Sequence, residues 1–327
     1  SRKRSHPRMI KWLQRQSAAV RVCFAFGYCA IYYGLYVLSG VFSLDTVTTV
    51  LVTVFPVFYG AATQLLFDLL LSKPARQTFG LFALPVVLLC VALLLIELET
   101  LICIAVLLPI FMVLGWFGQW IMRVVLRKAL VNATSDTLNV SLLLLPILAV
   151  PLFGQLEFPQ TQMRVTTQIA IEAPQDVVWD NTVAISEIQS AERVSTFSHN
   201  ILGTPRPIDA VLVGDVRKLR WTGGVVFEEH LTALESNTSM TWNFVFNAPE
   251  TLTAFDPHIA PQGGIVNMQS GSYHLTSLPN DVTSLTLETN YSIRTPVNTY
   301  LAIWGEVFLQ DFHHTVLSVI KTRSEKG

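Results

Sequence analysis

The stretch "VTTQIAIEAPQDVVWD" at residues 165–180 joins the pattern of a strand directly to the start of a helix. Its first seven residues alternate as in a half-buried strand and put four side chains on one face: Val165, Thr167, Ile169 and Ile171. Pro174 then falls in the first turn of a helix that continues to about residue 185, and Asp176 lies where the helix dipole favours an acid. We therefore expect the second half of the chain to open with a strand and a short helix.

Further strand patterns follow, separated by turn residues. VRKLRW (216–221) and VVFEEHLTAL (225–234) flank Gly223-Gly224, which is typical of a hairpin. Alternation continues in three later segments: MTWNFVF (240–246), SYHLTSL (272–278) and VTSLTLETNYSI (282–293). These patterns predict an antiparallel sheet with one buried face.

A long helix is expected to close the chain. Asn298 is a good N-cap after Thr295-Pro296. At helical spacing six apolar side chains then form one stripe: Leu301, Trp304, Phe308, Phe312, Val316 and Val319. Because this face needs a partner and the sheet is available, we expect an α+β helix-grip arrangement.

The same segments resemble a known superfamily. "IAIEAPQDVVWD", "GDVRKLRWTGGVVFEEHLTALESNTSMTWNF" and the closing "YLAIWGEVFLQDFHHTVLSVIKTRSE" are similar to the SRPBCC, or START-related, superfamily and fit its polyketide cyclase/dehydrase and lipid-transport branch over about residues 164–325. This resemblance implies an apolar cavity between a curved sheet and the long carboxy-terminal helix. It also implies a hydrophobic ligand such as a lipid, sterol or polyketide.

Strand and helix periodicity suggests which side chains lie between helix and sheet. The candidates are Trp242, Phe244, Tyr273, Leu285, Leu287, Tyr291, Trp304, Phe308 and Phe312, which either line a ligand cavity or fill a solid core. Glu228 and Glu229 point to opposite faces of their strand, so at most one faces inward, and a buried one needs a partner such as Arg220. We include Arg220 and Glu228 as candidate polar lining.

Few groups suit catalysis. Asp256 and His258 occur in "FDPHIAPQGG" (255–264), which is also typical of a rigid turn. Asp311 lies beside the apolar stripe with His314 one turn further on, whereas His313 is expected to point outward; the Asp311/His314 pair suits a general base or an ordinary solvated helix face. Neither spacing is an established metal site and no cofactor motif is present, so no metal or cofactor is expected.

The first half of the chain has a different composition. The whole chain is 51% hydrophobic and only 14% charged, and its apolar runs concentrate before residue 158. Five segments approach the length that crosses a bilayer: 20–41, 47–71, 79–96, 100–122 and 138–158. We expect a membrane domain over residues 1–158 with about five transmembrane helices, the fifth being the weakest, and a helix-grip domain over residues 159–327.

Charge divides at the same boundary. Residues 1–154 hold twelve Lys/Arg and five Asp/Glu, whereas residues 155–327 hold ten and eighteen, so the acidic second half argues against a nucleic-acid partner. Basic residues flank alternate apolar segments, which predicts a cytoplasmic amino terminus in a bacterial inner membrane. Five spans place the second domain in the periplasm, and four place it in the cytoplasm.

Two functional classes follow, with a third left open. The first is a membrane-anchored module that binds a hydrophobic molecule, such as a lipid, a polyketide or a quinone-like molecule, with the bilayer and that ligand as its partners. The second is a cyclase/dehydrase-type or hydrolase-type enzyme that uses the Asp and His groups, and the third is an assembly or regulatory protein with a filled interior. Asp68, inside the second apolar segment, has either a transport role or a position at the membrane interface.

Overall fold

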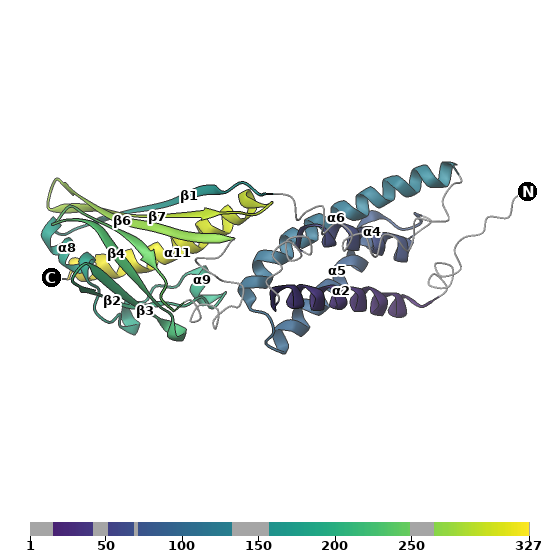
Figure 1. The fold of residues 1–327 in the computed structure, drawn as a ribbon, viewed down its shortest axis with the longest axis horizontal. Coiled ribbons are helices and arrows are strands. Elements are labelled where there is room, and N and C mark those ends of the chain that lie inside the picture. Colours follow the sequence, from purple (N-terminus) through teal and green to yellow (C-terminus); the bar gives the residue numbers. More distant parts are fainter. Residues whose placement is uncertain (1–15, 42–51, 69–70, 133–156, 249–264, 327) are drawn as a thin grey trace, which may run out of the picture. The chain divides into compact units, whose positions relative to one another are not determined.

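A computed structural model describes residues 16–41, 52–68, 71–132, 157–248 and 265–326. The chain divides into two compact units, Ser1–Glu157 and Phe158–Gly327. The first is helical and the second is built on one sheet (Figure 1).

The described part of the helical unit contains α2 (Ala18–Val41), α4 (Phe55–Asp68), α5 (Ala75–Leu95) and α6 (Leu101–Asn132). Among these, α2, α5 and α6 are long and apolar enough to cross a membrane. They correspond to the apolar segments expected at 20–41, 79–96 and 100–122. Helix α4 covers part of the segment expected at 47–71. Of the segment expected at 138–158, residues 138–156 lie outside the described residues.

Helices α4 and α6 approach each other at glycines. A Cβ added to Gly60 of α4 would overlap the carbonyl oxygen of Gly115, and one added to Gly118 of α6 would overlap that of Val57. Small residues allow such backbone contact, which is a common way for helices to pack where no hydrophobic effect drives them together. We infer that α4 and α6 form a tight pair.

The second unit contains a seven-stranded antiparallel sheet in the order β1-β7-β6-β5-β4-β3-β2. Its strands are β1 (Thr161–Ile171), β2 (Pro207–Val213), β3 (Val216–Trp221), β4 (Val226–Glu235), β5 (Ser239–Val245), β6 (Val266–Leu278) and β7 (Val282–Ile293). The short helices α8 (Gln175–Val183) and α9 (Phe197–Asn200) and the 3-10 turn η1 (Ser190–Glu192) connect β1 to β2. Strand β2 and helix α9 were not expected from the sequence.

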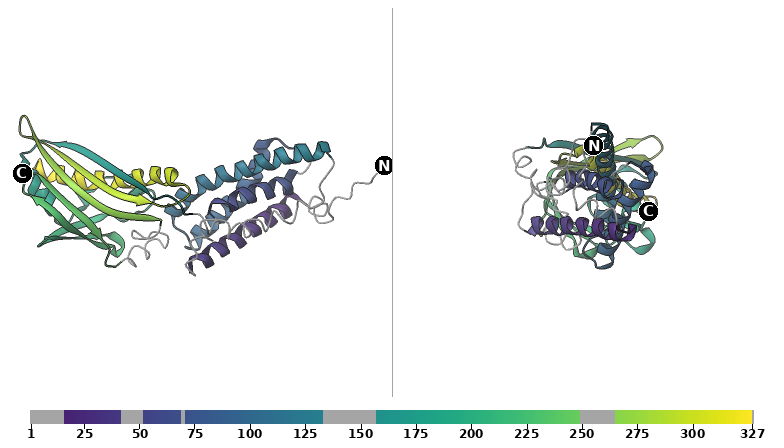
Figure 2. Two further views of the ribbon diagram at one scale, coloured as in Figure 1. Left: turned by 45° about the horizontal axis from the view of Figure 1, so that its top comes forward. Right: turned by 90° about the vertical axis from the view of Figure 1, so that its right-hand side faces the viewer.

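The last helix, α11 (Asn298–Ser324), runs along the inner side of the curved sheet (Figures 1 and 2). It packs on β1, β7, α8 and α9. A seven-stranded antiparallel sheet curved around a long terminal helix is the helix-grip arrangement, so this prediction is confirmed.

The buried stripe of α11 differs from the expected one. Of the six expected side chains only Val319 is fully buried, and the other buried side chains in the second half of the helix include His313, Leu317 and Ile320, at spacings of four and three residues. The expectation that His313 points outward was wrong, because its imidazole lies between two threonine hydroxyls on the sheet. Nδ1 is 3.0 Å from Oγ1 of Thr167, and Nε2 is 2.8 Å from Oγ1 of Thr289.

Candidate functional site

Strand register defines the inner face of the sheet, which looks toward α11. Across β3, β4 and β5, Arg217 pairs with Glu229, and Glu229 pairs with Phe244. Directly opposite residues of neighbouring strands share a face, so these three side chains point to the same side. Trp242 and Phe244 alternate along β5 and belong to the core cluster on this side.

The structure places the expected aromatic and aliphatic candidates of the sheet on this inner face. Trp242, Tyr273, Leu285, Leu287 and Tyr291 are buried, and Phe244 is half-buried. Two of them press against glycines: a Cβ on Gly271 would overlap the indole of Trp242, and one on Gly305 of α11 would overlap the hydroxyl of Tyr291. Their role in ligand binding stays a prediction.

A connected line of aromatic rings crosses the inner face from α11 to β6. Neighbouring ring centroids lie 5.1 to 6.3 Å apart along the series Phe312, Trp221, Phe227, Phe244, Trp242 and Tyr273. The first four rings are only half-buried although they face the interior. Rings at these separations favour further stacked or edge-to-face contacts.

Helix α11 contributes a second, shorter aromatic group. Trp304 and Phe308 stack with their centroids 5.8 Å apart, and both are half-buried. In the first half of α11, from Asn298 to Phe312, no described side chain is fully buried. The flank of α11 that carries Trp304, Phe308 and Phe312 is therefore less covered than the stripe through His313.

One ion pair is buried on the inner face. Nη1 of Arg217 donates to Oε2 of Glu229 over 2.9 Å, and Nη2 donates to the carbonyl oxygen of Thr182 in the last turn of α8 over 3.1 Å. The guanidinium also lies 5.6 Å from the ring centre of Tyr273. Burial raises the pKa of Glu229, and the adjacent Arg217 guanidinium opposes that rise. The group joins β3 to β4 and to the negative end of the α8 dipole.

The expectation that Arg220 and Glu228 face the interior is corrected by this register. Both are even-numbered, whereas the inward side chains of β3 and β4 are odd-numbered. Arg220 is 62% exposed and pairs with Asp209 of β2. Glu228 lies on the outer face, where it accepts hydrogen bonds from Nδ2 of Asn247 over 2.8 Å and contacts Nε2 of His230 at 2.9 Å.

The Asp311 and His314 side chains do not form the pair considered above. Oδ2 of Asp311 accepts a hydrogen bond from the backbone N–H of Ser198 over 2.7 Å, whereas His314 is exposed. Asp311 therefore joins α11 to the first turn of α9. The histidine that this contact brings inside is His199, which stacks on Phe312 with a centroid distance of 5.3 Å.

Sequence reasoning missed His199. Its neighbours "TFSHN" (196–200) match no site motif, and its burial depends on the contact between α9 and α11. Nδ1 of His199 lies 2.9 Å from Oγ1 and 3.2 Å from the carbonyl oxygen of Thr204. Burial lowers the pKa of His199 and so favours the neutral imidazole.

Asp256 and His258, the catalytic candidates of the segment 255–264, lie outside the described residues. Within the part of the chain that is described, no group of three or more His, Cys, Asp or Glu side chains is arranged to hold a metal ion.

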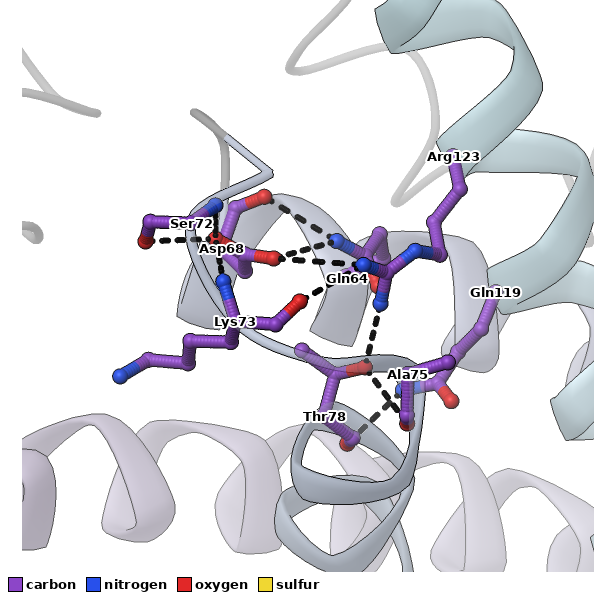
Figure 3. A network of polar contacts seen from close by, with 8 residues as sticks. All are labelled: Gln64, Asp68, Ser72, Lys73, Ala75, Thr78, Gln119 and Arg123. Carbon is purple, nitrogen blue, oxygen red and sulfur yellow. Dashed lines mark hydrogen bonds and ion pairs between the residues drawn. The ribbon is translucent and has the colours of Figure 1, made fainter.

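In the helical unit, Asp68 belongs to a polar network at the end of α4 (Figure 3). Its Oδ1 accepts hydrogen bonds from the backbone N–H of Ser72 at 2.7 Å and of Lys73 at 3.2 Å. Arg123 of α6 donates to the Lys73 carbonyl oxygen at 2.7 Å and to Oγ1 of Thr78 at 3.0 Å. The carboxylate thus closes the turn after α4 and binds backbone groups, which favours a structural role.

Residues on α6 indicate the depth of this network. Trp116 and Trp120 are 53% and 52% exposed, and tryptophans concentrate at membrane interfaces. From Leu101 to Trp120 the helix rises about 28 Å, close to the thickness of a bilayer core. Arg123 follows within one turn, so in a membrane Asp68 would lie near the headgroups and not at mid-depth.

Comparison with known proteins yields structural likeness only. The Zhui aromatase/cyclase from Streptomyces sp. R1128 is 14% identical over 51% of this chain and 96% of its own, with a TM-score of 0.32. A truncated norcoclaurine synthase from Thalictrum flavum is 9% identical over 51% and 96%, with a TM-score of 0.33. A protein from Bacillus thuringiensis is 14% identical over 49% and 97%, also with a TM-score of 0.33. No family model and no curated protein matches.

At these TM-scores the likeness carries no argument of its own. The class of the second unit rests on its strand order and on α11, which define a helix-grip domain. The fold alone does not name a function.

Proposed function

We propose that this chain is a membrane-anchored module whose helix-grip domain binds a hydrophobic molecule between the sheet and α11. The observation that carries the proposal is the line of interior aromatic rings, of which four remain half-buried. A solid core of this size normally buries such rings completely. Apolar, aromatic linings with a few polar groups are typical of small-molecule sites.

Surface composition supports the anchor. Exposed apolar side chains extend along the three long helices: Ile31 is 64% exposed, Leu95 78% and Val113 63%. A surface of this kind is unfavourable in water and favourable in lipid. We propose a bacterial inner membrane with a cytoplasmic amino terminus, and a periplasmic helix-grip domain if residues 138–158 cross. A compartment-specific reporter fused to the carboxy terminus distinguishes the two sides.

Ligand binding is tested by filling the interior. Leu219 faces inward opposite Phe227, whereas Val211 of β2 lies opposite Lys218 on the outer face. The full-length chain in detergent is expected to retain a hydrophobic molecule detectable by extraction and mass spectrometry. Leu219→Trp should reduce its amount at least about tenfold, because the indole occupies the space, and the matched control Val211→Trp should retain it.

Two results would contradict the proposal. One is a native chain that neither retains nor takes up any hydrophobic molecule. The other is equal retention by the Leu219→Trp and Val211→Trp variants when both are folded.

A further inference from the structure

Three buried side-chain polar atoms have no hydrogen-bond partner among the described residues: Oγ of Ser198, Nε2 of His199 and Nε1 of Trp221. They come from different elements, α9 and the end of β3. Ser198 is 0% and His199 5% exposed, so bulk water does not satisfy them. A buried polar group without a partner costs about 1–3 kcal/mol, so each of these atoms indicates a further group beside it.

The rings of His199 and Trp221 both contact Phe312. The imidazole stacks on the phenyl ring with an interplanar angle of 23°, and the indole meets it edge-on at 88°. Phe312 lies at the α11 end of the aromatic line. A planar molecule that follows this line therefore ends beside the unpartnered atoms.

Their chemistry specifies what the end of that molecule carries. Nδ1 of His199 faces the carbonyl oxygen of Thr204, which only accepts, so we assign the ring proton to Nδ1 and leave Nε2 as an acceptor. The indole Nε1–H of Trp221 only donates. A hydroxyl can donate to one and accept from the other, whereas an ether only accepts and a hydrocarbon does neither.

We propose that the ligand is a planar hydrophobic molecule with a terminal hydroxyl, such as a phenol, which donates to Nε2 of His199 and accepts from Nε1 of Trp221. This inference rests on the proposed function, because it concerns the polar end of the same interior site.

Three small probes separate the two hydrogen bonds. 2-Naphthol donates and accepts, 2-methoxynaphthalene only accepts, and naphthalene does neither. Their affinities for the full-length chain in detergent are measured by titration calorimetry, with protein-free micelles as the blank. We expect 2-naphthol to bind about tenfold more tightly than naphthalene, with 2-methoxynaphthalene between them.

Two variants keep the rings and remove one polar atom each. His199→Phe should abolish the preference for 2-naphthol over 2-methoxynaphthalene, because the acceptor is lost. Trp221→Phe should abolish the preference for 2-methoxynaphthalene over naphthalene, because the donor is lost. His230→Phe on the outer face of β4, the matched control for His199→Phe, should leave both ratios unchanged.

The outcomes separate this inference from the proposed function. If no probe binds and the chain retains no ligand, the proposed function fails. If all three probes bind the native chain equally, or if both variants keep the native ratios, the interior binds apolar molecules but the hydroxyl site is refuted. If His199→Phe does not fold, as judged by circular dichroism, the ratio measured for Trp221→Phe decides.

Discussion

The two units of this chain each bury a pair of opposite charges, and they satisfy those charges in different ways. In the sheet unit, Arg217 and Glu229 are 2.9 Å apart and each is the main partner of the other. In the helical unit, Asp68 and Arg123 are 3.9 Å apart. There each charge has its own neutral partners: the turn at Ser72 and Lys73 binds the carboxylate, and carbonyl and hydroxyl oxygens bind the guanidinium (Figure 3).

This difference shows that a buried charge does not always need its ion-pair partner to be stable in the folded protein. Removing one member of a directly bonded buried pair leaves an uncompensated charge, which is costly. Removing one member of the more distant pair leaves the other with most of its hydrogen bonds. Four measurements on the full-length chain in detergent, with hydrogen exchange read separately for peptides of each unit, test this comparison.

The largest effect is expected for Glu229→Gln. The variant keeps the side-chain shape but leaves the Arg217 guanidinium without its counter-charge, so the sheet unit should lose about 3 kcal/mol of stability. Faster exchange in β3 and β4 is the expected readout. The double variant Arg217→Met/Glu229→Leu should recover most of the loss, and a single variant as stable as the native chain would contradict the account.

The second effect is a loss of stability at low pH, which we expect in the sheet unit and not in the helical unit. Burial lowers the pKa of His313 from 6.5 to about 4, so between these values the unfolded chain binds a proton that the folded chain does not. The contribution of His313 to stability is complete above pH 6.5 and falls as the pH decreases toward 4, by about 3 kcal/mol in all. The described residues of the helical unit contain no histidine, so its exchange should not follow this profile. His313→Gln should make the profile of the sheet unit shallower, and His199, whose pKa is also lowered by burial, contributes to what remains.

Asp68→Asn is the helical counterpart of Glu229→Gln and should cost less, about 1 kcal/mol, because the amide oxygen still accepts from the turn and Arg123 keeps its neutral acceptors. Hydrogen exchange of peptides from α4 and α6 measures this loss of stability. A loss equal to or larger than that of Glu229→Gln would show that the 3.9 Å pair acts as a true buried ion pair.

The smallest effect is expected for Arg164→Gln. Arg164 is 66% exposed and its Nε lies 3.3 Å from Oε1 of Glu288 on the outer face of the sheet. Exposed pairs of this kind contribute less than about 1 kcal/mol, and salt screens them. A loss comparable to that of Glu229→Gln would mean that burial is not the factor that separates these pairs.

Much of the fold was predictable because alternation and helical periodicity are local properties. The strands at 216–221 and 282–293 have the expected bounds. The last helix begins at Asn298 with Val297 as its N-cap, so the expectation that Asn298 is the N-cap was wrong by one residue. Strand β2, "PIDAVLV", was missed because it is short and begins at Pro207, two residues after Pro205. Helix α9 has four residues and is too short for a periodic pattern.

The polar part of the site was less predictable. Glu228 and Glu229 are adjacent, and composition does not say which one faces inward. His313 and His314 pose the same problem on α11. Glu229 faces inward beside Arg217 because of the register between β3 and β4. His313 is buried because Thr167 and Thr289, on two strands of the sheet, contact its ring.

By itself, the sequence determined the two-part composition of this protein, three of its long apolar helices, most of its strands and the terminal helix of the grip. Each of these depends on neighbours within a few residues. The tertiary structure alone decided which charges are paired, which histidine stacks on Phe312 and which polar atoms meet there without partners. These depend on strand register and on the rotation of α11, and that rotation is set by packing between distant residues such as Ser198 and Asp311, which are 113 positions apart.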